Sequence, residues 1–332
     1  MLEGLDSRTA LIYRPIAAKL AEVERRLREL PGASSGFEEL SQVLDHVLLT
    51  RGKRVRPAIT LLSYQLNPDS PSDDERPILM AVDVEMLHIA TLIHDDTVDN
   101  SPIRHGRATL GSLWGHNVAL LVGDYVFATS ATFVCDTQNI RVVRRFAETL
   151  KELSSGELLE YFQTFQWDQT REDYLDRIYR KTASLFRTAA ETGAILSGAP
   201  EEAVKAMEGY GYNLGIAFQI VDDILDFQGN VQEVGKPVGN DLLQGVMTLP
   251  AILLVERSPE DNPIRELFEK RNGDGNLEEV IRLVQRSGII EECYAVAEGY
   301  CRKAAQCISG FQDSPSKDSL LELTRFVMER RR

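Results

Sequence analysis

A run of aspartates at the end of an apolar helical segment constrains this chain more than any other feature. Residues 93–99 read Ile-His-Asp-Asp-Thr-Val-Asp and follow apolar positions at helical spacing. Asp95 and Asp99 therefore project one turn apart from the same helix face. Like charges at this spacing repel each other, and the helix end predicted at residues 100–102 adds a negative dipole. The arrangement indicates a cation between the carboxylates, and hard oxygen ligands on a small footprint suit Mg²⁺.

The same pattern recurs in residues 218–227, which read Phe-Gln-Ile-Val-Asp-Asp-Ile-Leu-Asp-Phe. Here Asp222, Asp223 and Asp226 stand between apolar residues on both sides, unlike the acids of a solvated helix face. Burying carboxylates without partners costs several kcal/mol. A chance acidic patch in an acidic chain would explain one such motif. Two motifs, each framed by apolar residues, favour a paired metal-binding site.

Composition limits the partners and the compartment of the chain. Its 332 residues are 43% hydrophobic, and 37 Lys and Arg against 51 Asp and Glu give a net charge of −14. This balance argues against nucleic acid or an anionic membrane surface as the main partner. The four cysteines form no CxxC pair and no zinc-type spacing with the five histidines, which favours free thiols in a reducing compartment. Since residues 1–6 show no signal-peptide pattern and no uncharged apolar run reaches about 18 residues, we expect a cytoplasmic protein without a membrane span.

A basic segment stands out in this acidic chain. Residues 50–57 read Thr-Arg-Gly-Lys-Arg-Val-Arg-Pro. Pro57 suits the first turn of the next helix, so Lys53 and Arg56 would flank a helix N-terminus, where backbone N–H groups favour an anion. The alternative is an ordinary solvated basic loop.

Three further polar features lie within or next to the apolar helical segments. His88 lies two turns before Asp95, although a lone histidine on an apolar helix is more often a core residue than a ligand. The loop at residues 101–107 adds cations beside the first acid motif. Lys181 and Thr182 interrupt a later apolar pattern with a cation and a hydroxyl.

Helical spacing of apolar residues runs through almost the whole chain, and strand-type alternation is nearly absent. Breaks are expected at residues 31–32, at 154–156 and at a turn over 272–276. We therefore predict an all-α fold, a single large helical bundle over residues 1–332 with the two acid motifs facing each other across a central cavity. The predicted helical segments cover residues 8–30, 37–49, 77–99, 109–134, 138–167, 171–197, 201–228 and most of the chain from 249 onward.

These residue types favour one kind of chemistry. No Ser-His-Asp or Cys-His arrangement, Gly-rich phosphate loop or dinucleotide fingerprint is visible in the sequence. Two carboxylate clusters that can hold Mg²⁺, with Lys, Arg and His nearby, describe a site for diphosphate groups. Metal ions that neutralise a diphosphate make it a leaving group, and apolar helices offer a cavity for the hydrocarbon left behind. The pattern favours ionising an apolar diphosphate over hydrolysing a nucleotide.

The chain resembles the trans-isoprenyl diphosphate synthases, in particular the branch that makes geranylgeranyl or longer polyprenyl diphosphates. Each matching motif is weak evidence alone, but together and in family order they are specific. The motifs are Gly-Lys-Arg-Val-Arg-Pro at 52–57, Asp-Asp-Thr-Val-Asp at 95–99, Lys-Thr at 181–182, Phe-Gln-Ile-Val-Asp-Asp-Ile-Leu-Asp at 218–226 and Gly-Lys-Pro-Val-Gly-Asn-Asp-Leu at 235–242.

The resemblance implies an all-α isoprenoid-synthase fold, usually homodimeric, that condenses an allylic diphosphate with isopentenyl diphosphate. Three Mg²⁺ ions would bridge the allylic diphosphate to the acid motifs, and the released pyrophosphate would take the final proton. The implied metal site comprises Asp95 and Asp99 for two ions and Asp222 for the third, with Asp96, Asp223 and Asp226 as nearby or water-mediated ligands. The implied substrate site comprises Arg104, Lys181 and Lys236 for the allylic diphosphate, Lys53, Arg56 and His88 for isopentenyl diphosphate, and Thr182 and Gln219 beside the developing allylic cation.

Two departures from the family pattern weaken phosphate binding without removing the metal site. The family usually has Arg-Arg-Gly after the first motif, with the second Arg reaching isopentenyl diphosphate, and this chain has His105 in that place. A histidine supplies a hydrogen bond and, when protonated, a charge, but no bidentate fork. The family also often has Lys where this chain has Val246.

Product length depends on the helix before the first motif. A prenyl tail whose diphosphate is held at Asp95 would pass Ala90 and Thr91, one turn earlier. Short-chain members of the family typically carry an aromatic floor here, so these small residues imply products of C20 or longer, with a stop deeper, at Tyr125 or Phe146. Alternatively, the small residues only permit close helix packing.

Two other functions share part of this pattern. A class I terpene cyclase also uses the first aspartate motif, but its second metal motif normally mixes Asn or Asp with Ser or Thr and Glu. A non-catalytic subunit of a heteromeric prenyl synthase generally lacks one or both acid motifs. This chain keeps two complete Asp-Asp-x-x-Asp motifs, which favours chain elongation.

Overall fold

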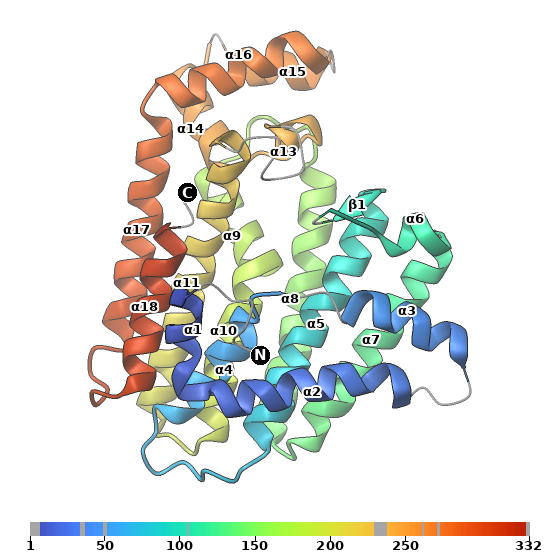
Figure 1. The fold of residues 1–332 in the computed structure, drawn as a ribbon. Helices are drawn as coiled ribbons and strands as arrows, with labels where there is room; N and C mark the ends of the chain where they lie inside the picture. The colour runs from blue at the N-terminus through green and yellow to red at the C-terminus, as the bar shows by residue number, and fades with distance from the viewer. Residues whose placement is uncertain are drawn as a thin grey trace. The chain divides into compact units, whose positions relative to one another are not determined.

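Helices make up nearly the whole structure, a computed structural model that describes residues 7–33, 37–48, 52–104, 106–228, 238–260, 262–270 and 273–329. Within these residues the only strands are β1 (Ile103–Arg104) and β2 (Arg107–Ala108), a short antiparallel pair. The all-α prediction is confirmed (Figure 1). The helical elements are α1 (Ser7–Tyr13), the 3₁₀ turn η1 (Arg14–Ile16), α2 (Ala17–Ala33), α3 (Glu38–Leu48), α4 (Val55–Gln65), α5 (Arg76–Val98), α6 (Leu110–Trp114), α7 (His116–Asp136), α8 (Ile140–Gln163), α9 (Arg171–Ile178), the π-helix η2 (Tyr179–Ala183), α10 (Ser184–Leu196), α11 (Glu201–Gln228), α13 (Asn240–Leu243), α14 (Leu249–Arg257), α15 (Pro263–Lys270), α16 (Gly273–Arg286), α17 (Ile289–Cys307) and α18 (Pro315–Glu329).

The chain forms two compact units, and each carries one acid motif. Unit 1 comprises residues 1–147, 187–208 and 308–322, and unit 2 comprises residues 148–186, 209–307 and 323–332. The predicted single domain, with its acid motifs facing across a central cavity, stays a prediction.

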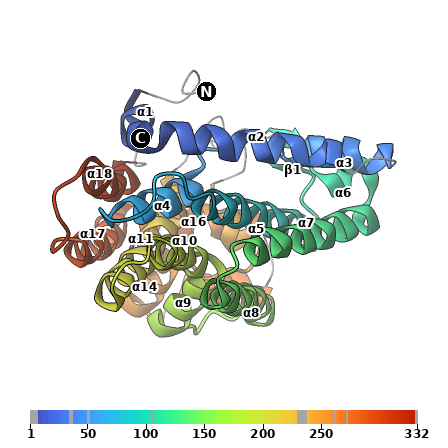
Figure 2. The same ribbon diagram turned by 90° about the horizontal axis from the view of Figure 1, so that it is seen from below.

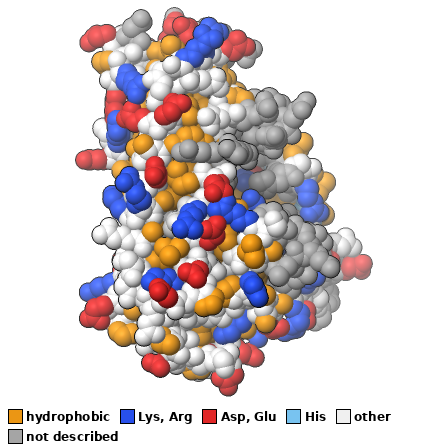
Figure 3. Space-filling view, turned by 60° about the vertical axis from the view of Figure 1, so that its left-hand side comes forward, with side chains coloured by type: hydrophobic (Ala, Val, Ile, Leu, Met, Phe, Trp, Pro, Cys, Tyr) orange, Lys and Arg blue, Asp and Glu red, His pale blue; other side chains and the backbone are white. Residues whose placement is uncertain are grey.

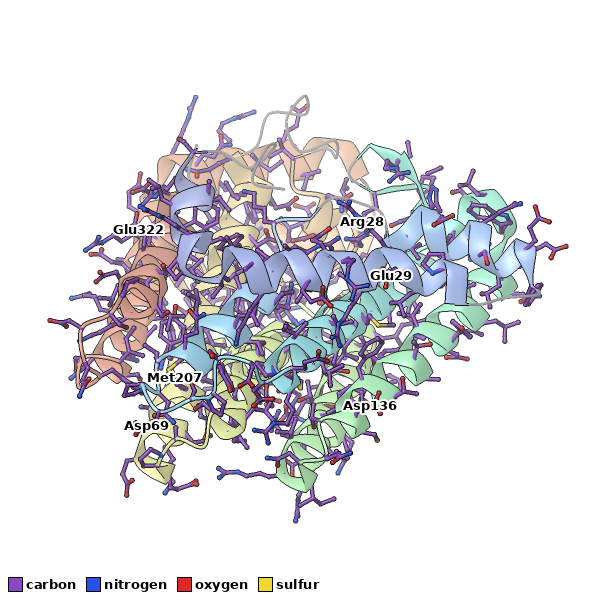
Figure 4. All side chains as sticks on the ribbon, turned by 60° about the horizontal axis from the view of Figure 1, so that its bottom comes forward. Arg28, Glu29, Asp69, Asp136, Met207 and Glu322 are labelled. Carbon is purple, nitrogen blue, oxygen red and sulfur yellow. The ribbon has the colours of Figure 1, made fainter. Side chains whose placement is uncertain are left out.

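Helix α5 is the core of unit 1. It packs against α2, α4 and, along most of its length, α7, and Figures 1 and 2 both show α5 and α7 side by side. Its side chains are buried from Met80 to Leu87 without interruption. Each fully buried Leu, Val or Met contributes about 1.5–3 kcal/mol. At the chain ends of this unit, Arg8 of α1 donates to Glu322 of α18 at 2.8 Å; Glu322 is labelled in Figure 4.

Two described helices, α5 and α7, are long and apolar enough to cross a membrane by length and composition alone. Within the apolar window of α5, 72% is buried inside the structure, as expected of a core helix, against 33% for α7. The exposed part of α7 includes Leu120, Leu121 and Tyr125. Burial in the core therefore explains the apolar composition of α5 but only part of that of α7.

Unit 2 is built around α11 and α14. Helix α14 packs against α9, α16 and α17, and α15 packs against α16. The largest fully buried side chains of this unit include Tyr174, Arg177 and Phe227.

On the face of the molecule shown in Figure 3, Lys and Arg side chains are interspersed with Asp and Glu among apolar ones, so this face presents no single block of negative charge.

The predicted helix end at residues 31–32 is confirmed to within a residue, since α2 ends at Ala33 with Pro31 in its last turn, whose carbonyl accepts a hydrogen bond from the Ser41 hydroxyl at 2.8 Å. The other two predicted breaks are wrong. Helix α8 runs unbroken through residues 154–156. Helix α16 begins at Gly273, inside the predicted turn, because its buried face from Leu277 onward makes the amphipathic pattern outweigh the local turn composition.

Candidate active-site residues

The first acid motif lies at the C-terminal end of α5, as predicted. The Asp99 amide donates to the Asp95 carbonyl at 2.8 Å, which continues the helical pattern one residue past Val98. The Asp95 and Asp96 side chains are partly buried and Asp99 is exposed. Arg104 of β1 donates from Nε to Asp96 Oδ1 at 2.8 Å. The structure therefore brings the predicted diphosphate-binding arginine to the motif.

A glycine on α7 allows this end of α5 to pack closely. A Cβ at Gly123 would lie 2.2 Å from His94 Nε2, too close for any side chain. The His94 ring, one residue before Asp95, lies against α7, with Nε2 3.2 Å from the Leu120 carbonyl oxygen and 3.6 Å from Asp124 Oδ1. The turn that presents Asp95 is thereby packed closely against α7 through the His94 ring.

Among the described cations of the basic segment, Arg54 is buried in ion pairs, whereas Lys53 and Arg56 keep exposed surface. Arg54 is 8% exposed, has a left-handed backbone (φ 50°), and pairs with Glu85 of α5 at 2.6 Å and Glu24 of α2 at 2.5 Å. Lys53 is exposed and Arg56 is partly buried in the first turn of α4. Sequence reasoning did not distinguish Arg54 from its neighbours, although the apolar helix around Glu85 was a sign that this acid needs a buried cation.

The residues predicted to line the prenyl tail lie on two sides of α5. Ala90 has no exposed surface and stands one turn before His94, on the side that packs against α7. Thr91 stands one turn before Asp95, and its hydroxyl donates to the His88 carbonyl at 2.7 Å. His88 is partly buried on the same helix. Of Ala90 and Thr91, it is therefore Thr91 that lies on the same helix face as Asp95.

Of the deeper aromatic residues predicted to stop the tail, Tyr125 is 40% exposed on α7 and Phe146 is buried on α8. Neither role is tested by the structure. Val246, the second departure from the family pattern, is partly buried, and its amide donates to the Asp241 carbonyl at 2.8 Å. His105 and Lys236, both predicted to contact diphosphates, lie outside the described residues.

The three aspartates of the second motif, on α11, have three different surroundings. Asp222 is exposed, Asp223 is 4% exposed, and Asp226 is partly buried. The Asp226 carboxylate accepts the amides of Asn240 and Asp241, at 3.2 Å each, at the start of the short helix α13. Asp222 is thus exposed to solvent, whereas Asp226 binds the backbone at the start of α13.

Asp223 is the centre of a hydrogen-bonded chain that joins three elements. Tyr174 of α9 donates to its Oδ2 at 2.6 Å, and the Gln219 side-chain amide donates to its Oδ1 at 2.7 Å. The Thr182 hydroxyl donates to Gln219 Oε1 at 2.8 Å. Burial raises the pKa of Asp223 to about 7, although both hydrogen bonds oppose the shift. The structure thus unites the predicted Thr182 and Gln219 with the acid motif.

Lys181 and Thr182 lie on a π-helix, a local form often found at functional sites. The interruption seen in the sequence is this single wide turn. Lys181 Nζ pairs with Glu160 at 2.6 Å and Glu157 at 3.0 Å, both on α8. A Cβ at Gly156 of α8 would lie 2.6 Å from the Lys181 amide nitrogen, so a glycine is needed where α8 passes the wide turn.

The carboxylates of unit 2 repel one another. The pKa of Asp241 is raised well above its usual range by burial first, and then by the charges of Asp226, Asp223, Glu160 and Asp222. No three His, Cys, Asp or Glu side chains among the described residues form a ready metal cage. Mg²⁺ needs none, because it commonly takes one or two carboxylates and completes its shell with water and substrate phosphate. The acids of both motifs therefore fit ions that arrive with a diphosphate.

An all-α chain has the make-up of a prenyl-transferring enzyme when it carries two aspartate-rich helices, one paired with Arg104 and the other hydrogen-bonded to Thr182, next to Lys181. Residues 37–284 match the family model described as polyprenyl synthetase. A prenyl transferase of Synechocystis sp. is 35% identical over 97% of this chain and 98% of its own. An all-trans-nonaprenyl-diphosphate synthase (geranyl-diphosphate specific) of Rhodobacter capsulatus is 34% identical over 96% of this chain and 97% of its own.

The fold comparison agrees. The crystal structure of a decaprenyl diphosphate synthase from Rhodobacter capsulatus superposes with a TM-score of 0.90 at 35% identity, over 98% of this chain and 99% of that one. The chain belongs to the polyprenyl synthetase family and is a prenyltransferase. The resemblance, the isoprenoid-synthase fold and the enzyme class predicted from the sequence are confirmed.

Proposed function

We propose that this prenyltransferase condenses isopentenyl diphosphate with an allylic prenyl diphosphate and releases pyrophosphate, giving a trans-polyprenyl diphosphate of C20 or longer. The observation that carries the proposal is that both acid motifs are complete and that each is joined to predicted substrate-binding residues: Arg104 donates to Asp96 of the first motif, and Thr182, next to Lys181, is linked through Gln219 to Asp223 of the second. The nonaprenyl and decaprenyl names of two similar proteins support the long product.

The acid motifs are proposed to hold Mg²⁺, with Asp95 and Asp99 at two ions and Asp222 at the third. When bound with substrate, the ions neutralise the leaving diphosphate. Asp96, Asp223 and Asp226 are proposed, from the family resemblance, as nearby or water-mediated ligands. The exposure of Asp99 and Asp222 supports this assignment, because each can reach a ligand without breaking a core contact.

The cations are proposed to orient the two diphosphates. Arg104, Lys181 and Lys236 would hold the allylic group, and Lys53, Arg56, His88 and His105 would hold isopentenyl diphosphate. Thr182 and Gln219 would present oxygen atoms to the developing allylic cation, which such dipoles stabilise. No described residue is assigned as the general base, since the released pyrophosphate can accept the proton that isopentenyl diphosphate loses.

One assay separates this function from its alternatives. The purified protein is incubated with isopentenyl diphosphate and C10, C15 or C20 allylic primers, with and without Mg²⁺, and products are identified by mass spectrometry. Longer prenyl diphosphates support the proposal, whereas cyclic hydrocarbons would show a terpene cyclase and no product a non-catalytic subunit. Asp95→Ala and Asp222→Ala should each lose activity by orders of magnitude with the fold retained, while Asp69→Ala, at an exposed acid between α4 and α5, should not.

A homodimer is proposed from the exposed apolar face of α7. Leu120 is 50% exposed, Leu121 65% and Tyr125 40%, and burial of such side chains contributes about 1.5–3 kcal/mol each. Light scattering of Leu121→Glu should show a monomer if this face is the interface. Leu11→Glu, at a leucine that is 66% exposed on α1, is the matched control. A dimer unchanged in Leu121→Glu would place the interface elsewhere.

The proposed compartment is the cytoplasm. Cys135, Cys293, Cys301 and Cys307 are all free thiols in the structure, which fits a reducing environment. Localisation of a tagged full-length chain by cell fractionation tests this assignment.

A further inference from the structure

We propose that Tyr174 is a positioning residue for the prenyl transfer: through Asp223 it fixes the side-chain amide of Gln219, so that the Gln219 and Thr182 oxygens keep one orientation. The inference rests on the proposed function and adds a residue that neither the motifs nor the comparisons assign. It also gives Asp223 a task different from that of Asp222.

The hydrogen-bond directions give the reason. A glutamine side chain presents an acceptor and a donor of nearly the same shape, so its orientation is set only by its neighbours. Asp223 Oδ1 accepts from Gln219 Nε2 at 2.7 Å, which turns Oε1 toward the Thr182 hydroxyl at 2.8 Å. With Asp223 ionised, a reversed amide would place Oε1 against the carboxylate, and the two oxygens would repel each other. The acceptor at Asp223 therefore decides which atom of Gln219 meets Thr182.

Tyr174 holds that acceptor in place. Its hydroxyl donates to Asp223 Oδ2 at 2.6 Å, and its ring has no exposed surface. Asp223 is thus bound through one oxygen by α9 and through the other by its own helix, with Gln219 one turn earlier on α11. Without the hydroxyl, the carboxylate loses one of its two donors and can rotate about its side-chain bonds. The Gln219 amide would then lose its fixed partner.

The same geometry separates Asp223 from the metal. Its two oxygens accept hydrogen bonds from the buried Tyr174 and the partly buried Gln219, and the residue is 4% exposed. Asp222, the preceding residue, is exposed. These two hydrogen bonds fix the orientation of the carboxylate, and its low exposure favours a nearby or water-mediated position over direct coordination. Asp222 and Asp223 therefore have different roles: Asp222 faces the diphosphate-bound ions, and Asp223 orients the residues beside the cation.

The test compares rates with metal dependence. Tyr174→Phe removes one oxygen and keeps the ring, so kcat should fall by on the order of tenfold or more, while KM for both substrates stays within about twofold of wild type. The Mg²⁺ concentration for half-maximal rate should stay at the wild-type value in Tyr174→Phe and Asp223→Asn, and rise in Asp222→Asn. Tyr294→Phe is the control, since it removes a comparable hydroxyl bond, to Gln228 at 2.8 Å, in the same unit.

A double-mutant cycle tests the route through the amide. If Tyr174 acts through Gln219, the variant carrying both Tyr174→Phe and Gln219→Ala should be little slower than Gln219→Ala alone. The proposal is overturned if the two substitutions lower kcat independently, so that the double variant loses the product of the two single losses. It is also overturned if Tyr174→Phe has the wild-type kcat. A rise in the half-maximal Mg²⁺ concentration for Asp223→Asn equal to that for Asp222→Asn would overturn it as well. These outcomes all presuppose an active wild-type enzyme, whereas failure of the proposed function would appear as a wild-type protein without prenyl product.

Discussion

Asp83 places a carboxyl group where α5 meets α7, and its surroundings predict an unusual dependence of stability on pH. The side chain has no exposed surface, and within the described residues neither oxygen meets a hydrogen-bond donor at good geometry. Ser130 of α7 lies nearby, but its hydroxyl donates to the Phe127 carbonyl at 2.9 Å. Burial raises the pKa of Asp83 well above its ordinary value, and the Ser130 hydroxyl opposes this only in part. We therefore expect the folded chain to hold Asp83 protonated at pH values where the unfolded chain has released the proton.

The sign of the effect follows from that difference. Above the unfolded pKa of about 3.9, the folded state binds more protons than the unfolded state, so the free energy of unfolding falls as pH rises. The contribution of one such group is at most about 1.4 kcal/mol per pH unit, and it ends when pH passes the folded pKa. Asp83→Asn keeps the shape of the side chain and has no proton to lose. Between pH 5 and pH 7 the variant should therefore gain up to about 2.7 kcal/mol relative to wild type.

Urea unfolding followed by circular dichroism at pH 5, 6 and 7 measures this difference. The amide of the variant adds its own constant cost or benefit, so the decisive quantity is the change of the wild-type-to-variant difference with pH. Asp69→Asn, at an exposed acid, is the control and should show a difference that is nearly independent of pH. If the Asp83→Asn difference were equally flat, Asp83 would be ionised in the folded chain and the reasoning from burial would be wrong.

Three further outcomes test other contacts. Gly156→Ala should lower stability by about 1–3 kcal/mol and reduce kcat, because the added methyl group overlaps the backbone of the π-helix. Thermal unfolding and rate assays measure both effects. Gly299→Ala is the control and should change neither stability nor kcat, because a Cβ there meets nothing within 4 Å. Arg54→Ala should cost about 3–5 kcal/mol in urea unfolding, because it leaves a buried glutamate unpaired. Thr91→Phe and Ala90→Phe should shift the products toward C15, as identified by mass spectrometry, while sparing the first condensation. Ala90→Phe, at a fully buried site, should also lower the melting temperature. Unchanged product lengths in both variants would refute length control by these two residues.

The parts of the site that depend on helical periodicity could be predicted from the sequence. The spacing of Asp95 and Asp99, the end of α5 near residue 99 and the position of His88 all follow from a local rule that repeats every turn. The same rule located the second motif on α11. It worked because the apolar residues before each motif continue in one unbroken helix, so that spacing alone sets which acids share a face.

What depends on partners far along the chain could not be predicted. Nothing local marks Arg54, rather than Lys53 or Arg56, as the cation that turns inward, because the choice is made by Glu24 and Glu85 on two other helices. Gly156 predicted a helix break because glycine disfavours helices. In the structure the same lack of a side chain lets an intact α8 pass close to the backbone of Lys181.

Tyr174 was missed for a related reason. It stands two turns before Lys181 on a helix of ordinary amphipathic pattern, where a tyrosine reads as part of the core. Its hydroxyl acquires a role only when α11 brings Asp223 to it. The available signal was the second motif itself, since a carboxylate surrounded by apolar residues requires donors from elsewhere in the fold.

Unit 2 keeps carboxylates together at a cost to its own stability, and that cost bears on how the site works. Asp241 is partly buried, and burial of its carboxyl group together with the charges of four other acids raises its pKa. Lys181 pairs with Glu160, which is one of these acids, and with Glu157, both on α8. A chain selected for stability alone would replace some of these acids, because each unneutralised charge opposes folding. The retention of these acids is explained if positive charge arrives with the substrate. Metal ions bound to the diphosphate would then relieve the repulsion between the carboxylates when the substrate binds.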